Sequence, residues 1–249
     1  MFTYSMNRSS VFRRTDDEFG GLSNMSRSWP LKVYGCRVRT TEHLYQAMRF
    51  PEWPDIQQQI LDTNKPKAAK LVAREYDEFT RVDWFDVRVD VMRWCLAIKL
   101  GQHVTRFGNL LDSTGDQPVV EFSKRDSFWG AAPNECGQLM GNNVLGQLLE
   151  ELRASWRNAQ SSGCLEDLQT IEPPPIPECR LLHLPVDKMR LKEDGQMPIL
   201  LTSDEIYQLQ LPGEPAVGHL AAWCRQQQIN GKITSQDQAV ALLLNFAAR

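Results

Sequence analysis

Apolar residues recur at helical spacing along much of the chain, most clearly between residues 142 and 157. Successive apolar positions there lie three or four residues apart, which places them on one face of a helix. This stripe consists of Val144, Leu145, Leu148, Leu149, Leu152 and Trp156. The pattern predicts an amphipathic helix over 142–157 that buries one side.

Three other stretches also predict helices. One predicted helix covers residues 41–50, and either Thr40 or Thr41 suits its N-cap. Residues 66–75 open with a proline, which is favourable in a first turn because the N–H that it lacks would have no partner there. Residues 86–100 form a fourth candidate.

Apolar and polar residues alternate over 29–39, which predicts a strand, or a hairpin turning around Gly35. The region up to residue 160 is therefore predicted to be α+β, mainly α-helical, with a small β-element. A change in composition follows it, because 161–163 is Ser-Ser-Gly and 173–175 is three prolines. Consecutive prolines lack amide donors and favour polyproline II, so no helix is expected to cross them.

These features divide the chain into a body over 1–160, a Pro-rich linker over 161–179 and a small C-terminal α+β domain over 180–249. Within this domain, residues 180–184 and 197–201 predict short strands that pair around Asp194 and Gly195. Two capping-box patterns and an apolar stretch over 216–228 predict three helices. The capping boxes are Thr202 with Glu205 and Ser235 with Gln238.

Composition is that of a globular chain, with 42% hydrophobic and 24% charged residues. The longest apolar run has six residues, far fewer than a membrane span needs, and no secretory signal is visible near Met1. The six cysteines are scattered and read as reduced thiols. We therefore expect a cytoplasmic protein with no membrane partner.

Charge gives no support for nucleic acid as the main partner. Residues 1–160 hold 21 Lys and Arg against 20 Asp and Glu, and the rest of the chain is acidic. Neither part has the strongly basic balance typical of proteins that bind nucleic acid through phosphate neutralisation. A local basic groove remains compatible with these numbers.

Common metal and nucleotide motifs are missing from the sequence. The four histidines have no ligand spacing, and no glycine-rich phosphate loop or nucleophile elbow is found. The sequence predicts neither a metal site nor a cofactor. Cys136 has no recognisable base partner, so a catalytic thiol is not favoured.

Polar residues in aromatic and glycine-rich surroundings stand out in three places: 18–25, 41–50 and 126–146. On a helix, Glu42 shares one face with Tyr45, Gln46 and Arg49. Each polar residue also has a structural interpretation: Glu42 suits the first turn of a helix because of the helix dipole, and Asp126 suits a turn. Trp129 is equally suited to a core.

The order and spacing of four segments resemble the NADAR family. These segments are Leu22-Ser23-Asn24, Thr41 through Phe50, Asp126 through Gly130, and Asn143 through Arg153, with Trp84 and Lys99 in matching places between them. The resemblance spans about residues 10–157 and implies the NADAR fold. The chain departs from the pattern at Arg49, where many members have lysine, and over 131–140, which replaces a short glycine-rich stretch.

The resemblance implies an N-glycosidase that cleaves the C1′–N bond of a ribosyl phosphate or an ADP-ribosyl compound. The implied substrates are riboflavin-pathway phosphoribosyl intermediates and ADP-ribosylated guanine, so the partner is a small nucleotide-like molecule or ADP-ribosylated nucleic acid. A non-catalytic ADP-ribose-binding module is the alternative.

The resemblance also implies roles for nine residues. The catalytic candidates are Glu42, Asp126 and Lys99, and the substrate-binding candidates are Asn24, Trp84, Trp129, Arg49, Asn143 and Arg153. Two mechanisms stay open: water attack assisted by carboxylates, and attack by an uncharged Lys99 amine that forms an imine. Each of two residues also has a structural interpretation. Lys99 could extend its amine to solvent at a helix end, and Arg153 could simply face solvent.

Overall fold

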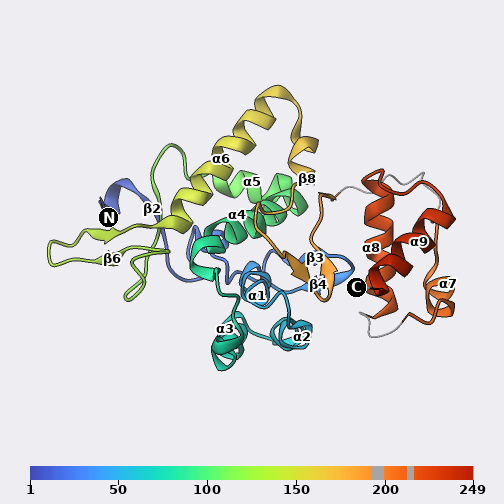
Figure 1. The fold of residues 1–249 in the computed structure, drawn as a ribbon. Coiled ribbons are helices and arrows are strands. Elements are labelled where there is room, and N and C mark those ends of the chain that lie inside the picture. The colour runs from blue at the N-terminus through green and yellow to red at the C-terminus, as the bar shows by residue number, and fades with distance from the viewer. Residues whose placement is uncertain (192–198, 212–215, 249) are drawn as a thin grey trace.

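The computed structural model describes residues 1–191, 199–211 and 216–248 (Figure 1). Its helices up to residue 162 are α1 (Thr41–Ala47), α2 (Pro54–Asp62), α3 (Pro66–Glu75), α4 (Trp84–Gln102), α5 (Val104–Asp112) and α6 (Val144–Ser162). The strands in the same region are β1 (Phe2–Tyr4), β2 (Ser10–Phe12), β3 (Leu31–Val33), β4 (Cys36–Val38), β5 (Val119–Glu121), β6 (Ala132–Pro133) and β7 (Leu139–Gly141). The mainly helical α+β class is confirmed.

The four helices predicted in this region are present, with the expected local chemistry. The Thr40 hydroxyl caps α1 by accepting a hydrogen bond from the His43 N–H at 3.4 Å. Pro66 opens α3. Helix α6 extends beyond its predicted end and stops at Gly163, whose φ of 74° is easy for glycine. Helices α2 and α5 were not anticipated.

Small sheets frame the helices. The predicted hairpin is confirmed: β3 and β4 are antiparallel and turn through Tyr34 and Gly35, at φ 45° and 76°. Strands β1, β7 and β6 form an antiparallel sheet, and β2 runs parallel to β5. The β2–β5 pair fixes the position of Glu121, which is the last residue of β5.

Helix α4 lies at the centre of the body, where α1, α5 and α6 contact it. Its buried residues include Trp94, Leu96 and Ile98, all at most 3% exposed. Helices α5 and α6 approach closely at Gly108, where an added Cβ would lie 1.9 Å from Trp156 Nε1. The body is thus a packed helical core, with the smaller β-elements at its periphery.

The segment predicted as a linker packs against this body. After α6 a 3₁₀ turn (Leu165–Gln169) and β8 (Thr170–Ile171) contact α4, and Ile171 is 5% exposed. Strand β8 pairs with β11 (Met189–Arg190). The division of the chain near residue 160 stays a prediction, but residues 161–191 are not a free tether.

Residues 180–184 do not form one strand, and 199–201 are not in a strand, while 197 and 198 of the predicted partner lie outside the described residues. Strand β9 (Arg180–Leu181) pairs instead with β10 (Leu184–Pro185), through a tight turn whose two residues have positive φ. The Gln57 side chain holds this turn, because it donates to the Arg180 carbonyl and accepts from the Leu182 N–H. Asp194 and Gly195 lie outside the described residues.

The last part of the chain contains α7 (Ser203–Gln208), α8 (Val217–Ile229) and α9 (Gln236–Ala247), and of these α8 lies beside the β3–β4 hairpin (Figure 1). The capping box of Thr202 and Glu205 is complete, whereas Ser235 caps α9 without a reciprocal bond from Gln238. Within the described ranges, no helix is long and apolar enough to cross a membrane.

Candidate active site

A cavity of about 660 Å³ lies between α1, α3, α4 and the segment 121–129. Three sequence regions far apart along the chain meet there: 23–25, 42–49 and 121–129. Six of the nine predicted site residues line it: Asn24, Glu42, Arg49, Trp84, Asp126 and Trp129. The other three lie elsewhere.

Glu42 is a buried carboxylate in the first turn of α1, with 6% exposure. Its N–H donates to the Asn24 carbonyl at 3.1 Å, and its Oε1 accepts from Gln46 Nε2 at 2.8 Å. Burial raises the pKa of Glu42, while the positive charge of Lys70 and the bond from Gln46 oppose that rise. A fixed carboxylate in such a low-dielectric place interacts strongly with charge that develops beside it.

Glu121 is a second cavity carboxylate, and sequence reasoning missed it. It follows two fully buried valines on β5. Burial raises the pKa of Glu121 to about 7, and the nearby charges of Glu42 and Asp126 add to the rise. A glutamate directly after an apolar strand was the available signal, but only the fold brings it to Glu42.

Asp126 lines the cavity and also organises its own turn. Its Oδ1 accepts from the Phe128 N–H at 3.0 Å and from the Trp129 N–H at 2.9 Å. The two interpretations offered by the sequence, turn residue and cavity residue, therefore hold together. The turn sets the position of Trp129 at the cavity wall.

Aromatic rings form one wall of the cavity. Tyr45 lies at its centre, 5.0 Å from the Trp84 ring and 5.6 Å from the Trp129 ring. The Trp129 ring contacts Phe128 edge-on at 5.1 Å. Such a wall is suited to stack against a planar ring and to keep water from the carboxylates.

Four cationic side chains face these groups. Arg49 donates to Gln46 Oε1, Asp77 and Thr80, and its Nε is buried with no partner among the described residues. The Arg88 guanidinium lies 3.7 Å from the centre of the Phe128 ring. Lys70 and Arg74 come from α3, and neither side chain makes a hydrogen bond or ion pair within the described part of the chain. Guanidinium and ammonium groups that line a cavity together are suited to bind phosphate.

Asn24 contributes an unsatisfied amide. Its Nδ2 lies 3.1 Å from the Met92 sulfur, and its Oδ1 is buried without a hydrogen-bond partner among the described residues. Buried polar atoms are usually paired, so this amide has bonding capacity left for a ligand.

Lys99 does not line the cavity, which corrects its predicted place in the site. Its amine is fully buried and donates to the carbonyls of Gly21, Leu22 and Ser23, at 2.9, 3.3 and 3.2 Å. It also lies 4.2 Å from the centre of the Phe107 ring. Burial holds the pKa of Lys99 well below its usual value. The amine holds the 21–23 loop in place through these bonds. It does not line the cavity, so it cannot form an imine with a substrate bound there.

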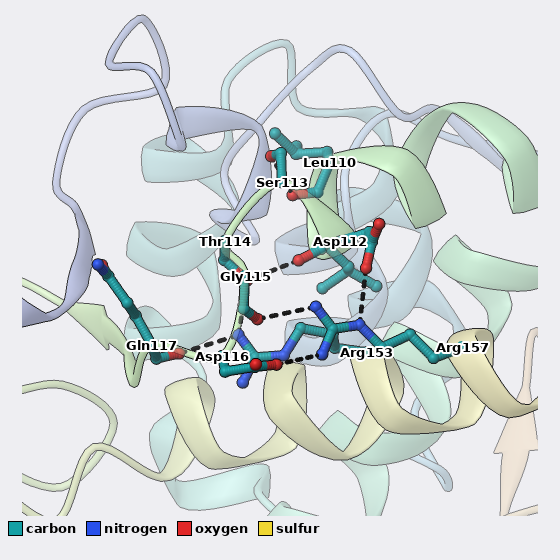
Figure 2. Close-up of polar contacts among 10 residues, drawn as sticks. Leu110, Asp112, Ser113, Thr114, Gly115, Asp116, Gln117, Arg153 and Arg157 are labelled. Atoms are coloured by element: carbon teal, nitrogen blue, oxygen red, sulfur yellow. Dashed lines mark hydrogen bonds and ion pairs between the residues drawn. The ribbon is translucent and has the colours of Figure 1, made fainter.

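Asn143 and Arg153 also have structural positions. Asn143 is fully buried at φ 52° and bonds to β5. Figure 2 shows Arg153 directed toward the turn after α5, where it donates to Thr114 Oγ1 at 2.7 Å and to the Gln117 carbonyl at 2.9 Å. Arg153 is therefore neither solvent-facing nor a cavity residue.

No group of three or more His, Cys, Asp or Glu side chains is placed to hold a metal ion in 1–191, 199–211 or 216–248. The fold and cavity define a mainly helical α+β enzyme with carboxylates that share one cavity beside an aromatic wall. The model of the NADAR domain matches residues 11–157, and the chain belongs to the NADAR family.

Known proteins agree with this assignment. The Escherichia coli N-glycosidase YbiA is 34% identical over 142 residues, which cover 57% of this chain and 84% of YbiA. The Vibrio vulnificus riboflavin biosynthesis protein VVA0006 is 33% identical over 150 residues, 59% of this chain and 38% of that protein. The solved structure of Escherichia coli YbiA aligns with a TM-score of 0.52 at 31% identity, covering 64% of this chain and 90% of YbiA.

Proposed function

We propose that the protein is an N-glycosidase that hydrolyses the C1′–N bond of a ribosyl phosphate or an ADP-ribosyl compound. Family membership and the names of the relatives support the class of activity. The observation that carries the proposal is that two glutamates, the buried Glu42 and the half-buried Glu121, line one cavity beside aromatic rings and cations. These are the groups that cleavage of a glycosidic bond to nitrogen needs.

Breaking the C1′–N bond leaves positive charge on C1′ and on the ring oxygen of the ribose. The Glu42 carboxylate stabilises this charge. The electron pair of the broken bond goes to the nitrogen, and Glu121, protonated below about pH 7, gives that nitrogen a proton. Water then adds to C1′ and returns a proton to the carboxylate. The reaction consumes one water and needs no redox step.

The rest of the cavity binds and orients the substrate. Trp84 and Trp129 stack against the planar base, while Asp126 keeps the Trp129 turn in place. Arg49, Lys70 and Arg88 bind the phosphate or diphosphate. Because Lys99 has no contact with the cavity, the mechanism uses attack by water in place of a Lys99 imine.

A non-catalytic ADP-ribose-binding module is the alternative. Such a module needs the aromatic rings and the cations but gains nothing from two glutamates whose carboxyl groups have raised pKa values. A raised pKa means that burial disfavours the ionised form, which lowers folding stability at neutral pH. The cavity therefore favours an enzyme.

The test is incubation with two substrates, ADP-ribosyl-guanosine and a ribosylamino-pyrimidine phosphate, followed by mass analysis. We expect release of the free base or amine from at least one, with one oxygen of solvent water in the sugar product. Tight binding of ADP-ribose with no product from either substrate would establish the binding module instead.

A further inference from the structure

A groove of about 410 Å³ lies between three segments: the loop 51–53 before α2, residues 78–83 before α4, and residues 177–178. Within the described part of the chain, this groove and the active-site cavity share no lining residue. The two spaces are neighbours along the chain, because Asp83 lines the groove and Trp84 lines the cavity. The groove is therefore a second surface feature, separate from the site already described.

Apolar side chains line the groove and are open to solvent. Trp53 is 43% exposed, and the centre of its ring lies 4.8 Å from that of Phe79, with the two rings at 66°. Pro51 and Pro177 also belong to the lining, and Val82 is fully exposed there. Exposed apolar groups that gather in one groove are typical of an interaction surface.

Hydrogen bonds of Arg81 fix two sides of the groove relative to each other. Its Nε and Nη2 donate to the Asp83 carboxylate at 2.6 and 2.9 Å, and Nη2 also donates to the Pro177 carbonyl at 2.8 Å. The Arg81 side chain is 7% exposed, so solvent screens these bonds little. A groove that is fixed before binding loses less entropy when a ligand enters it.

The groove carries negative charge. Glu52 and Glu78 line it and are exposed, and neither side chain forms a hydrogen bond or ion pair within 1–191, 199–211 or 216–248. The two other carboxylates in the lining, Asp83 and Glu178, are each paired with an arginine. Free carboxylates beside an exposed tryptophan suit a guanidinium, which pairs with carboxylate and stacks on aromatic faces.

These features together define the chemistry of a ligand. Aromatic-lined grooves dock proline-rich segments, because the polyproline II helix is already formed in the free ligand and little entropy is lost on binding. Carboxylates at such a groove add a preference for a ligand with a basic residue, through charge complementarity.

The proline-rich run of this chain does not fit that description. Pro177 is part of the groove wall, and the run has Glu172 at one end and Glu178 at the other. In a second copy of the chain, these ends would meet Glu52 and Glu78 with like charge. The observations therefore favour a ligand from a different protein.

We propose that this groove docks a proline-rich segment of a partner protein, with its prolines against Trp53 and Phe79 and an arginine at Glu52 and Glu78. The inference goes beyond the proposed function and does not depend on it. Because the groove and the cavity have separate linings, the segment and a substrate bind at the same time.

The test measures binding of a fluorescent peptide of three Pro-Pro-Arg repeats to the full chain by anisotropy. Polyproline II has about three residues per turn, so the arginines of this peptide share one edge. Two control peptides change one feature each: Pro-Pro-Glu repeats reverse the charge, and Gly-Ser-Arg repeats keep the charge on a flexible chain. We expect each control peptide to bind about tenfold more weakly or worse.

A first pair of variants tests the aromatic wall. Trp53→Ala should weaken binding of the Pro-Pro-Arg peptide about tenfold, because an exposed tryptophan in a groove is a typical anchor of an interface. Tyr207→Ala removes an exposed aromatic side chain from α7, outside the groove, and should change binding less than about twofold. Circular dichroism checks that both variants are folded.

A second pair tests the charge, and it applies equally where Trp53→Ala fails to fold. The double variant Glu52→Gln and Glu78→Gln should weaken binding about fivefold at low salt and less at high salt, because both carboxylates are exposed. The control, Glu75→Gln and Glu135→Gln, removes the same charge from exposed positions outside the groove. It should change binding less than about twofold.

Four results would overturn the proposal. Three are no binding of the Pro-Pro-Arg peptide at low salt, equal binding of the Gly-Ser-Arg peptide, and equal losses in the groove variants and their controls. The fourth is a dimer in sedimentation that Trp53→Ala dissociates, which would assign the groove to a second copy of the chain. Hydrolysis of substrate enters none of these measurements, so the groove and the proposed function can fail separately.

Discussion

Asn143 holds Glu121 in place. The Asn143 side chain accepts a hydrogen bond from the Glu121 N–H at 3.1 Å and donates one to the Val119 carbonyl at 2.8 Å. Asn143 is fully buried and immediately precedes α6 in a left-handed conformation. A residue predicted to bind substrate therefore acts on the cavity indirectly, by fixing the end of the strand that carries a carboxylate.

Asn143→Ala should lower the free energy of unfolding by about 3 kcal/mol. The substitution leaves two buried backbone groups without partners and places alanine at a positive φ. Urea unfolding measures the loss, with Asn142→Ala as the control, because no hydrogen bond of the Asn142 side chain occurs among the described residues. A loss below about 1 kcal/mol for Asn143→Ala would contradict this role.

Glu121 should make stability depend on pH. Its folded-state pKa of about 7 lies above the ordinary value of 4.5, so its contribution is fully present below pH 4.5 and lost as pH rises through 7. Between pH 5 and 8, the wild-type protein should lose about 2 kcal/mol relative to Glu121→Gln, which cannot titrate. Urea unfolding at both pH values measures this difference. An equal change in the free energy of unfolding for the two proteins would mean that the cavity does not perturb the pKa of Glu121.

Lys99→Met should act on folding and leave the chemistry intact. The substitution removes the donor to three carbonyls of the 21–23 loop, so we expect a loss of about 2 kcal/mol in stability. Borohydride added during turnover should leave Lys99 unmodified by peptide mapping. A trapped adduct on Lys99 would restore the imine mechanism, whereas one on Lys70 would move that chemistry to the lysine that lines the cavity.

Truncation of the chain distinguishes a folding boundary at residue 160 from one at residue 191. Residues 161–191 bury Ile171, Leu181, Leu184 and Met189 to 5% exposure or less, and each such side chain contributes about 2 kcal/mol. We therefore expect a fragment ending at residue 191 to fold and a fragment ending at 160 to lose cooperative thermal unfolding. A 1–160 fragment with a sharp melting transition would instead support the boundary predicted from composition.

Local signals explain what the sequence predicted well. Pro66 at the start of α3, the Thr40 cap of α1 and the stripe on α6 each act within a few residues, so each can be recognised without the fold. Helix α5 was missed, and its pairing with α6 depends on close approach at Gly108.

The candidate site also has residues that the sequence predicted and residues that depend on the fold. Motif positions located Glu42, Asp126 and the cavity tryptophans, but the motif could not separate residues that contact the cavity from those that support it. Lys99 and Arg153 belong to the second group, because their partners are backbone carbonyls and a hydroxyl from distant segments. Glu121 depended on strand β5 reaching α1, which only the fold establishes.

Turnover by Glu42→Gln tests the central claim most directly. The substitution keeps the size of the side chain and removes the charge proposed to stabilise the transition state, so kcat should fall about 100-fold or more without a lower melting temperature. Glu75→Gln, an exposed change at the end of α3, is the control and should retain the wild-type rate. A Glu42→Gln protein that hydrolyses the C1′–N bond at close to the wild-type kcat would contradict the account.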